Sequence, residues 1–191
     1  FRWDLGPSLL TMPPILDRLF TELGERREDH LTLQPLTPTC RYRWADGYQF
    51  DENEFFWSRP DSARLLRHAQ GLYHLSSSAF LESDPSELWK KVFNPALLPL
   101  LRFLPAMSPF RSLASASRHF YSDPHLQQFL QRFATYNGSD PELTPATFAV
   151  IPYVQAHFGG WYIKGGIRRL AEALLKLAEK HGVEIHTAAE A

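Results

Sequence analysis

The stretch GGWYIKGG at residues 159–166 runs directly into an amphipathic segment that begins at Ile167, and it is the most informative local pattern in the chain. Its residues predict a short strand, a tight turn and the start of a helix. Paired glycines let another group approach the free backbone N–H donors of a helix start, and Trp161 and Tyr162 add flat apolar surface with polar tips. Glycines that only permit an awkward turn account for the same residues equally well.

The segment after this stretch predicts a helix from Ile167 to about Lys180, with Gly182 as its stop. Its apolar face is formed by Ile167, Leu170, Leu174 and Leu177. Residues 183–187 (VEIHT) are typical of a strand that enters a sheet, yet only four residues follow them. The chain also begins with Phe1 rather than Met, so we expect it to be an internal piece of a longer protein.

The first 60 residues predict one helix and a β-hairpin. Apolar positions within residues 9–23 have helical spacing, and Gly24 supplies a stop. Residues 31–33 and the run 40–50 alternate apolar with polar side chains, and the second run contains an Asp-Gly turn. We therefore expect strands in both places and a hairpin in the second.

Residues 60–133 are predicted to be mainly helical and are punctuated by proline. Helix starts are expected at Ser58 or Pro60, at Asp84 and at Asp123, because a proline in the first turn of a helix loses no hydrogen bond. The sequence YNG at 136–138 then predicts a loop that ends one helix before another begins.

Residues 93–107 form the most apolar run of the chain. Three prolines, Arg102 and a length well under the roughly 20 residues of a spanning helix exclude a transmembrane helix here. Two interpretations stay open: a buried core segment, or an interfacial element that contacts a membrane surface.

Composition excludes several classes of function. Twenty basic and twenty-one acidic side chains give a formal net charge of −1, so no overall field attracts nucleic acid. Hydrophobic residues make up 44% of the chain, which is too apolar for disorder. The single cysteine, Cys40, allows no internal disulfide and favours a reducing compartment, so we expect a cytoplasmic protein that is either free or peripheral to a membrane.

Known cofactor and catalytic motifs are missing from the chain. No G-x-G-x-x-G or P-loop pattern is present, so a nucleotide cradle cannot be placed on it. The eight histidines never recur at a spacing of three or four residues, and no cysteine pair accompanies them, so we expect no metal site. There is also no G-x-S-x-G nucleophile elbow.

Three motifs, in this order, resemble the phytoene desaturase family of FAD-dependent oxidoreductases. They are FRWDLGPSLLTMP at 1–13, YNG at 136–138 with TPA at 144–146, and GWYIKGG at 160–166. The resemblance covers essentially the whole chain and extends to carotene isomerase-like and retinol saturase-like members. It implies a parent enzyme that removes hydrogen from a long polyene and passes hydride to FAD, which a Rossmann-type domain holds.

The resemblance also implies roles for individual residues. Trp161 and Tyr162 are expected to bind substrate where it meets the cofactor. The residues expected near the cofactor are Gly165, Gly166, Asp4, Gly6 and Pro7. No residue is expected to serve as a dedicated acid or base, because the flavin carries the chemistry and the protein orients the substrate.

We therefore expect an α+β fold in which residues 1–191 form one substrate-binding domain, with a mainly helical layer over a small, mostly antiparallel sheet that includes the hairpin. The expected partners are an apolar polyene, the missing FAD-binding domain of the same parent and, through 93–107, a membrane surface. The isolated chain should hold no FAD and be inactive. Alternative hypotheses are a non-catalytic lipophile-binding or membrane-docking module, a flavin-dependent carotenoid cis/trans isomerase, or a retinol saturase-like enzyme.

Overall fold

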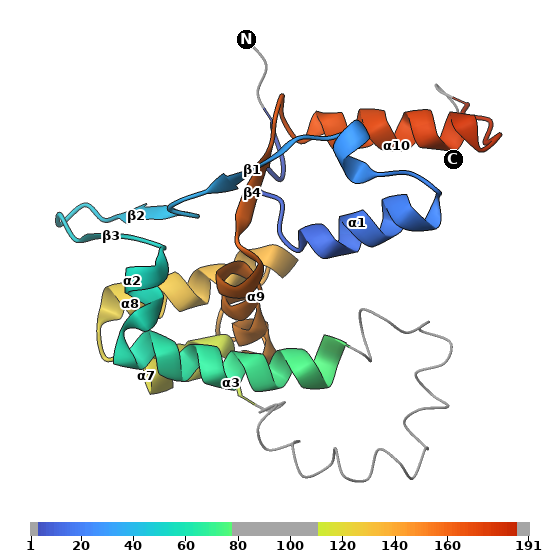
Figure 1. Cartoon of the computed structure of the whole chain (residues 1–191). Coiled ribbons are helices and arrows are strands. Elements are labelled where there is room, and N and C mark those ends of the chain that lie inside the picture. Colours follow the sequence, from blue (N-terminus) through green and yellow to red (C-terminus); the bar gives the residue numbers. More distant parts are fainter. Residues whose placement is uncertain (1–3, 78–110, 187–191) are drawn as a thin grey trace, which may run out of the picture. The chain divides into compact units, whose positions relative to one another are not determined.

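The structure is a computed structural model that describes residues 4–77 and 111–186 of the 191-residue chain. Within these residues helices predominate, and the strands form two separate antiparallel pairs (Figure 1). The α+β class is thereby confirmed. The expectation of one sheet that includes the hairpin is wrong, because the hairpin strands pair only with each other.

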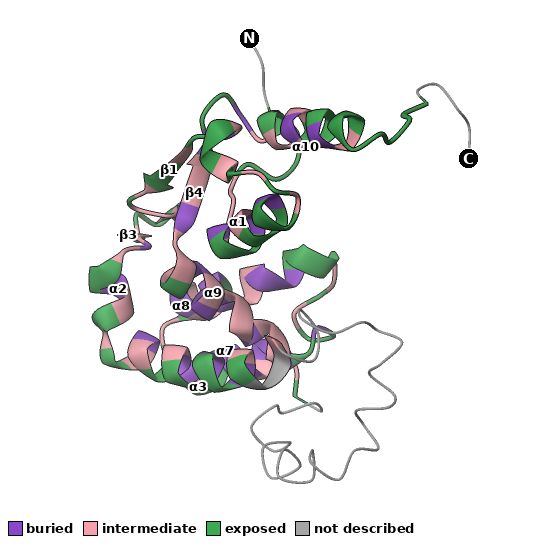
Figure 2. Ribbon diagram, turned by 45° about the vertical axis from the view of Figure 1, so that its right-hand side comes forward, coloured by how far each residue is buried: buried purple, intermediate pink, exposed green. Residues whose placement is uncertain are grey.

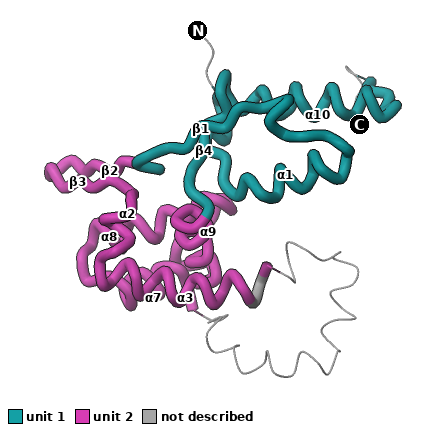
Figure 3. The backbone as a smooth tube through the Cα atoms, viewed as in Figure 1, with its two compact units in different colours: residues 1–39, 158–191 teal, residues 40–157 magenta. Residues whose placement is uncertain are grey.

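The chain forms two compact units (Figure 3). Unit 1 comprises residues 1–39 and 158–191, and unit 2 comprises residues 40–157. Unit 1 is thus built from the two ends of the chain, which makes neighbours of segments that are far apart in sequence.

Unit 1 contains two helices, a short 3-10 turn and one strand pair. Its elements are α1 (Pro13–Glu22), η1 (Arg27–Asp29), β1 (Leu33–Leu36), β4 (Gly160–Ile163) and α10 (Arg168–Lys180). Strand β1 runs antiparallel to β4, with Leu33 opposite Ile163 and Leu36 opposite Gly160. Pro35 lacks the N–H that a further strand would need, so it favours an edge position for β1. The buried core of this unit is formed by Leu16, Phe20, Leu31, Ile163, Ala173 and Leu177.

Helix α1 begins at Pro13, later than the predicted start at residue 9. The reason is a long-range contact: the backbone of Leu10 exchanges hydrogen bonds of 2.9 and 2.8 Å with the backbone of Trp161. These bonds hold the residues before Pro13 out of the helix. The predicted stop is confirmed, since Gly24 follows the helix with a left-handed φ of 74°.

Helix α10 and its glycine stop are confirmed, but the predicted strand after it is wrong. Gly182 has a φ of 77°, and the N–H of Val183 bonds to the carbonyl of Ala178 at 3.0 Å. These are features of a helix C-cap, which uses the N–H group that a strand would offer to a neighbour. No described strand pairs with residues 183–186, and Val183 and Ile185 are exposed.

Unit 2 is a hairpin followed by a helical bundle. Its elements are β2 (Arg41–Arg43), β3 (Gln49–Asp51), α2 (Glu54–Ser58), α3 (Pro60–Ser76), α7 (Leu113–Phe120), α8 (Pro124–Gln131), η4 (Arg132–Asn137), η5 (Ala146–Ala149) and α9 (Val150–Phe158). The predicted hairpin is confirmed, with Tyr42 opposite Phe50. Its turn depends on Gly47 at a φ of 90° and on the Asp46 carboxylate, which accepts a 3.0 Å hydrogen bond from the N–H of Tyr48.

Helices α2, α7 and α8 of unit 2 each follow a residue whose side chain accepts a hydrogen bond from the first turn. Helix α8 follows the predicted Asp-Pro start: the Asp123 carboxylate accepts a 2.8 Å hydrogen bond from the N–H of His125. Buried positions recur along α7 and α8 on one face (Figure 2). The core of this unit is formed by Phe56, Leu65, Leu72, Leu113, Phe120, Tyr121, Leu126, Phe129, Leu130, Phe133, Ala134 and Ala149.

Two sequence predictions fall on residues outside the described part of the chain. These are the helix start at Asp84 and the apolar segment 93–107 with its two interpretations. Among the residues that the structure describes, none of the helices has the length and apolar character needed to span a membrane.

Candidate functional site

Strand β4 holds the predicted substrate-binding residues Trp161 and Tyr162, both half-buried. The indole N–H of Trp161 donates a 2.7 Å hydrogen bond to the carbonyl of Phe158, so the ring is fixed and its polar tip is satisfied. The preceding glycine is required by close packing: a Cβ at Gly160 would lie 2.6 Å from Cγ2 of Thr39. The strand therefore presents its two aromatic residues from a tightly held backbone.

The turn between β4 and α10 needs both of its glycines. Gly165 and Gly166 have φ values of 93° and 94°, a left-handed region that side chains disfavour. Asp4 lies against this turn, because its Oδ2 would be 3.1 Å from a Cβ at Gly166. The same carboxylate accepts a 3.2 Å hydrogen bond from the N–H of Ile167. The structure thus brings Asp4 together with the glycine pair.

Gly6 and Pro7 are exposed. A Cβ at Gly6 would meet no atom within 4 Å, so the described residues do not require a glycine there. The motif TPA at 144–146 contributes to the packing of unit 2. Thr144 is buried, and its backbone carbonyl accepts a 2.7 Å hydrogen bond from the N–H of Leu113.

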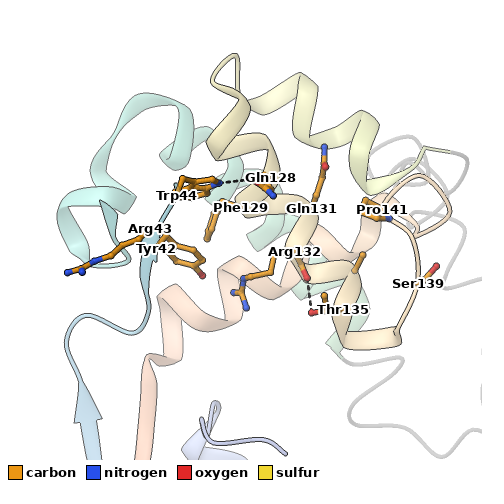
Figure 4. Close-up of a pocket in the computed structure, with 11 residues that line it drawn as sticks. Tyr42, Arg43, Trp44, Gln128, Phe129, Gln131, Arg132, Thr135, Ser139 and Pro141 are labelled. Carbon is orange, nitrogen blue, oxygen red and sulfur yellow. Dashed lines mark hydrogen bonds between the residues drawn. The ribbon is translucent and has the colours of Figure 1, made fainter. Parts of the chain in front are cut away.

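A cavity of about 490 Å³ lies in unit 2, between strand β2 and the segment α8–η4 (Figure 4). It is lined by Tyr42, Arg43, Trp44, Gln128, Phe129, Gln131, Arg132, Ala134, Thr135, Ser139 and Pro141. None of the residues predicted to bind substrate or cofactor lines it. The alternation of aromatic residues along the hairpin was the one sequence signal for the side of the cavity that Tyr42 and Trp44 form.

A buried carboxylate lies behind the cavity wall. Glu52 is 1% exposed, and its Oε2 accepts a 3.1 Å hydrogen bond from the hydroxyl of Tyr42. Its other oxygen has no partner among the described residues. Burial raises the pKa of Glu52 to about 7, against the lowering effects of the Tyr42 hydroxyl and the charge of Arg132. Burial, with the nearby Glu52 charge, also raises the pKa of Tyr42.

Arg132 is the half-buried cation of the cavity lining, which also includes the exposed Arg43. Its guanidinium carbon lies 4.5 Å from the ring centroid of Phe133 and 5.4 Å from that of Tyr42. Its Nε and Nη2 atoms are buried and have no hydrogen-bond partner in the part of the chain that the structure describes. Sequence reasoning missed Arg132 and Glu52, because nothing local marks a charged residue as buried.

The described side chains offer no metal centre, since no group of three or more His, Cys, Asp or Glu among them could hold an ion. The described residues form two candidate sites: a glycine turn beside aromatic residues in unit 1, and an aromatic cavity in unit 2 whose lining includes Arg132, a cation without a hydrogen-bond partner at Nε and Nη2. Both arrangements suit binding and orientation of a ligand.

Comparison with known proteins assigns the family. The model of the family described as flavin containing amine oxidoreductase matches residues 1–190. The chain belongs to this family. The resemblance inferred from the motifs is thereby confirmed at the level of a flavoprotein oxidoreductase family.

Curated relatives of this chain are named for carotenoid chemistry. The 4,4'-diapolycopene oxygenase of Methylomonas sp is 35% identical over 100% of this chain and 40% of the relative. The 1-hydroxycarotenoid 3,4-desaturase of Flavobacterium sp. (strain P99-3) is 33% identical over 96% of this chain and 40% of the relative. The hydroxyneurosporene desaturase of Rhodobacter capsulatus is 33% identical over 98% and 40%. The chain therefore spans about 40% of the length of these relatives.

Proposed function

We propose that this chain is the substrate-handling part of an FAD-dependent oxidoreductase that desaturates a carotenoid-like polyene. The observation that carries the proposal is the contact between the Asp4 carboxylate and the turn formed by Gly165 and Gly166. The family resemblance assigns both motifs to the neighbourhood of the cofactor, and they lie at one place although one is near each end of the chain. The names of the relatives support a polyene as the substrate.

The Asp4 carboxylate beside the glycine turn would suit a polar, uncharged part of FAD. The N–H of Ile167 is already bonded to Asp4, and a carboxylate repels phosphate, so this helix start does not suit the pyrophosphate. The missing side chains of Gly165 and Gly166 make room for the side chains of Arg169 and Asp4. The Asp4 carboxylate can accept a hydrogen bond from a hydroxyl or ring N–H of the cofactor. The pyrophosphate then belongs to a Rossmann-type domain outside this chain.

FAD, when bound, would supply the two-electron acceptor for removal of hydrogen from the polyene. The role of this chain is to orient the substrate and to exclude water. The fixed ring of Trp161 and the neighbouring Tyr162 provide an apolar surface beside the turn. A ring that does not reorient holds a reacting carbon in place more effectively than a mobile one.

Oxygenation of the polyene is the second candidate, because the Methylomonas relative is named an oxygenase. Product analysis of the full-length protein with FAD and an acyclic hydrocarbon polyene separates the candidates. We expect a product with a longer conjugated system, and hence a red-shifted absorption, and no added oxygen. An oxygen-bearing product would favour the oxygenase, and a product of unchanged mass would favour the isomerase. Binding without conversion would favour the lipophile-binding module.

A further inference from the structure

The cavity of unit 2 combines aromatic walls with an unpaired cation. Tyr42, Trp44 and Phe129 contribute rings, and the Tyr42 and Phe129 rings meet edge-on with centroids 5.1 Å apart. The side chain of Arg132 belongs to the same lining (Figure 4). Apolar and aromatic walls with a small number of polar anchors are typical of a site for a small, largely apolar molecule.

The unpaired groups of Arg132 define the chemistry of the anchor. Nε and Nη2 lie on the same edge of the guanidinium, the edge that can donate two hydrogen bonds side-on to oxygen. The guanidinium carbon lies over the rings of Phe133 and Tyr42, and neither Nε nor Nη2 has a hydrogen-bond partner among the described residues. A buried charged donor without an acceptor is costly, so an oxygen that accepts these N–H groups gains affinity.

The charge balance around Arg132 favours a neutral oxygen. Glu52 lies close enough for the positive charge of Arg132 to lower its pKa, although Oε1 of Glu52 and the Nε and Nη2 atoms of Arg132 have no hydrogen-bond partner among the described residues. A second anion in the cavity would compete with Glu52 for the same cation. A hydroxyl or carbonyl oxygen meets the donors without that repulsion.

Arg132 is half-buried and lines the cavity, whereas its Nε and Nη2 atoms are buried, so a ligand that bonds to this edge would require the side chain to rotate. Such rotamer changes are common when ligands bind. We propose that this cavity binds the oxygen-bearing end of an apolar isoprenoid chain, with Arg132 donating to a hydroxyl or carbonyl oxygen and the rings of Tyr42, Trp44 and Phe129 enclosing the adjoining carbons. The choice of an isoprenoid chain rests on the proposed function. Glu52 acts as a positioning residue, since it holds the hydroxyl of Tyr42 and offsets the charge of Arg132.

Equilibrium binding of two fluorescent probes to the full-length protein tests this site. The probes are all-trans-retinol and its deoxy hydrocarbon, which share the polyene and differ in the hydroxyl. We expect the alcohol to bind on the order of 10-fold more tightly than the hydrocarbon, as for a site built to hydrogen-bond an oxygen. Arg132→Met should reduce this ratio to about 2-fold or less by weakening the alcohol alone.

Arg67→Met is the matched control, because Arg67 is exposed in the same unit and is not part of the cavity lining. It should leave the ratio unchanged. If Arg132→Met fails to fold by circular dichroism, Arg132→Lys replaces it: this variant keeps the charge, loses the side-on edge and should also lower the ratio.

Equal affinity of the native protein for both probes would overturn the site, and so would an equal loss for both probes in the folded Arg132 variant. The outcome is distinguishable from failure of the proposed function. If the protein prefers the alcohol but converts no polyene, the binding site is supported and the desaturase proposal is contradicted. If the protein desaturates polyenes but does not prefer the alcohol, only the proposed binding site is contradicted.

Discussion

The Asp4 carboxylate caps helix α10 from the opposite end of the sequence, accepting a 3.2 Å hydrogen bond from the N–H of Ile167 across 163 positions. Such a bond satisfies one of the free N–H groups at the helix start and places a negative charge near its positive end. We expect Asp4→Ala to lower the free energy of unfolding by about 1 kcal/mol, measured by urea titration. Asp29→Ala is the control, because Asp29 is exposed and makes no side-chain hydrogen bond described in the structure. Equal effects of the two variants would contradict the capping role.

A Cβ at Gly166 is expected to disturb the same turn. Gly166→Ala would place a methyl group 3.1 Å from Asp4 Oδ2 at a φ of 94°, so we predict a loss of about 1–3 kcal/mol in unfolding free energy. Gly71→Ala is the matched control, since a Cβ there meets no atom within 4 Å and the residue lies inside helix α3. Alanine is favoured at such a position by about 0.5–1 kcal/mol. Opposite signs for the two variants in thermal unfolding are the expected result.

We expect the contacts of His125 to stabilise the hairpin of unit 2 most at mildly acidic pH. The ring of His125 bonds to Asp46 at 2.7 Å and to Asp123 at 3.1 Å, and stacks on Tyr48 with centroids 4.2 Å apart. The hydrogen bond to Asp46 is the largest cause of the raised pKa of His125, followed among the raising causes by the bond to Asp123.

Because the folded pKa lies above the ordinary value of 6.5, this stabilisation is complete below 6.5 and is lost as pH rises through the folded pKa. Urea titrations between about pH 6 and 9 should show stability falling with pH, and His125→Asn should flatten that part of the profile. An unchanged slope in the variant would show that another group titrates there. His186→Gln serves as a control, since that side chain is 79% exposed.

Glu52 should reduce stability when it ionises. Its pKa rises from 4.5 unfolded to about 7 folded, so the folded state loses stability as pH increases across this range. The shift corresponds to about 3–4 kcal/mol at most. We expect Glu52→Gln to raise the unfolding free energy at about pH 8 by 1–2 kcal/mol, since the loss of Arg132's counter-charge offsets part of the gain. At about pH 4 the variant and the native protein should be similar. Destabilisation by Glu52→Gln at about pH 8 would show that the carboxylate is needed in its charged form.

Much of the fold was predictable because its signals are local. The Asp-Gly turn of the hairpin, the Asp-Pro start at Asp123 and the glycine stops at Gly24 and Gly182 each act through backbone conformation over a few residues. The alternating pattern at 183–187 predicted a strand, but such alternation indicates only a preference for strand conformation. The N–H of Val183 was already used by the cap of α10.

The candidate sites were less accessible to sequence reasoning because they depend on contacts between distant segments. The glycine pair at 165–166 was visible, but its contact with Asp4 joins the two ends of the chain. The start of α1 was displaced by the pairing of Leu10 with Trp161, which no periodicity encodes. The burial of Glu52 and Arg132 arises only from tertiary packing.

The central claim is that the glycine turn and the aromatic strand beside it present a polyene to a flavin. Anaerobic stopped-flow mixing of the full-length, FAD-loaded protein with an acyclic polyene tests it directly, because reduction bleaches the flavin absorption in a single turnover. We predict bleaching by the native protein and by Gly71→Ala. Trp161→Ala, with its flavin content unchanged, should bleach at least 10-fold more slowly, because the reacting carbon is no longer held in place. A native protein that binds FAD and polyene without bleaching would contradict the account, as would a Trp161→Ala variant that bleaches at the native rate.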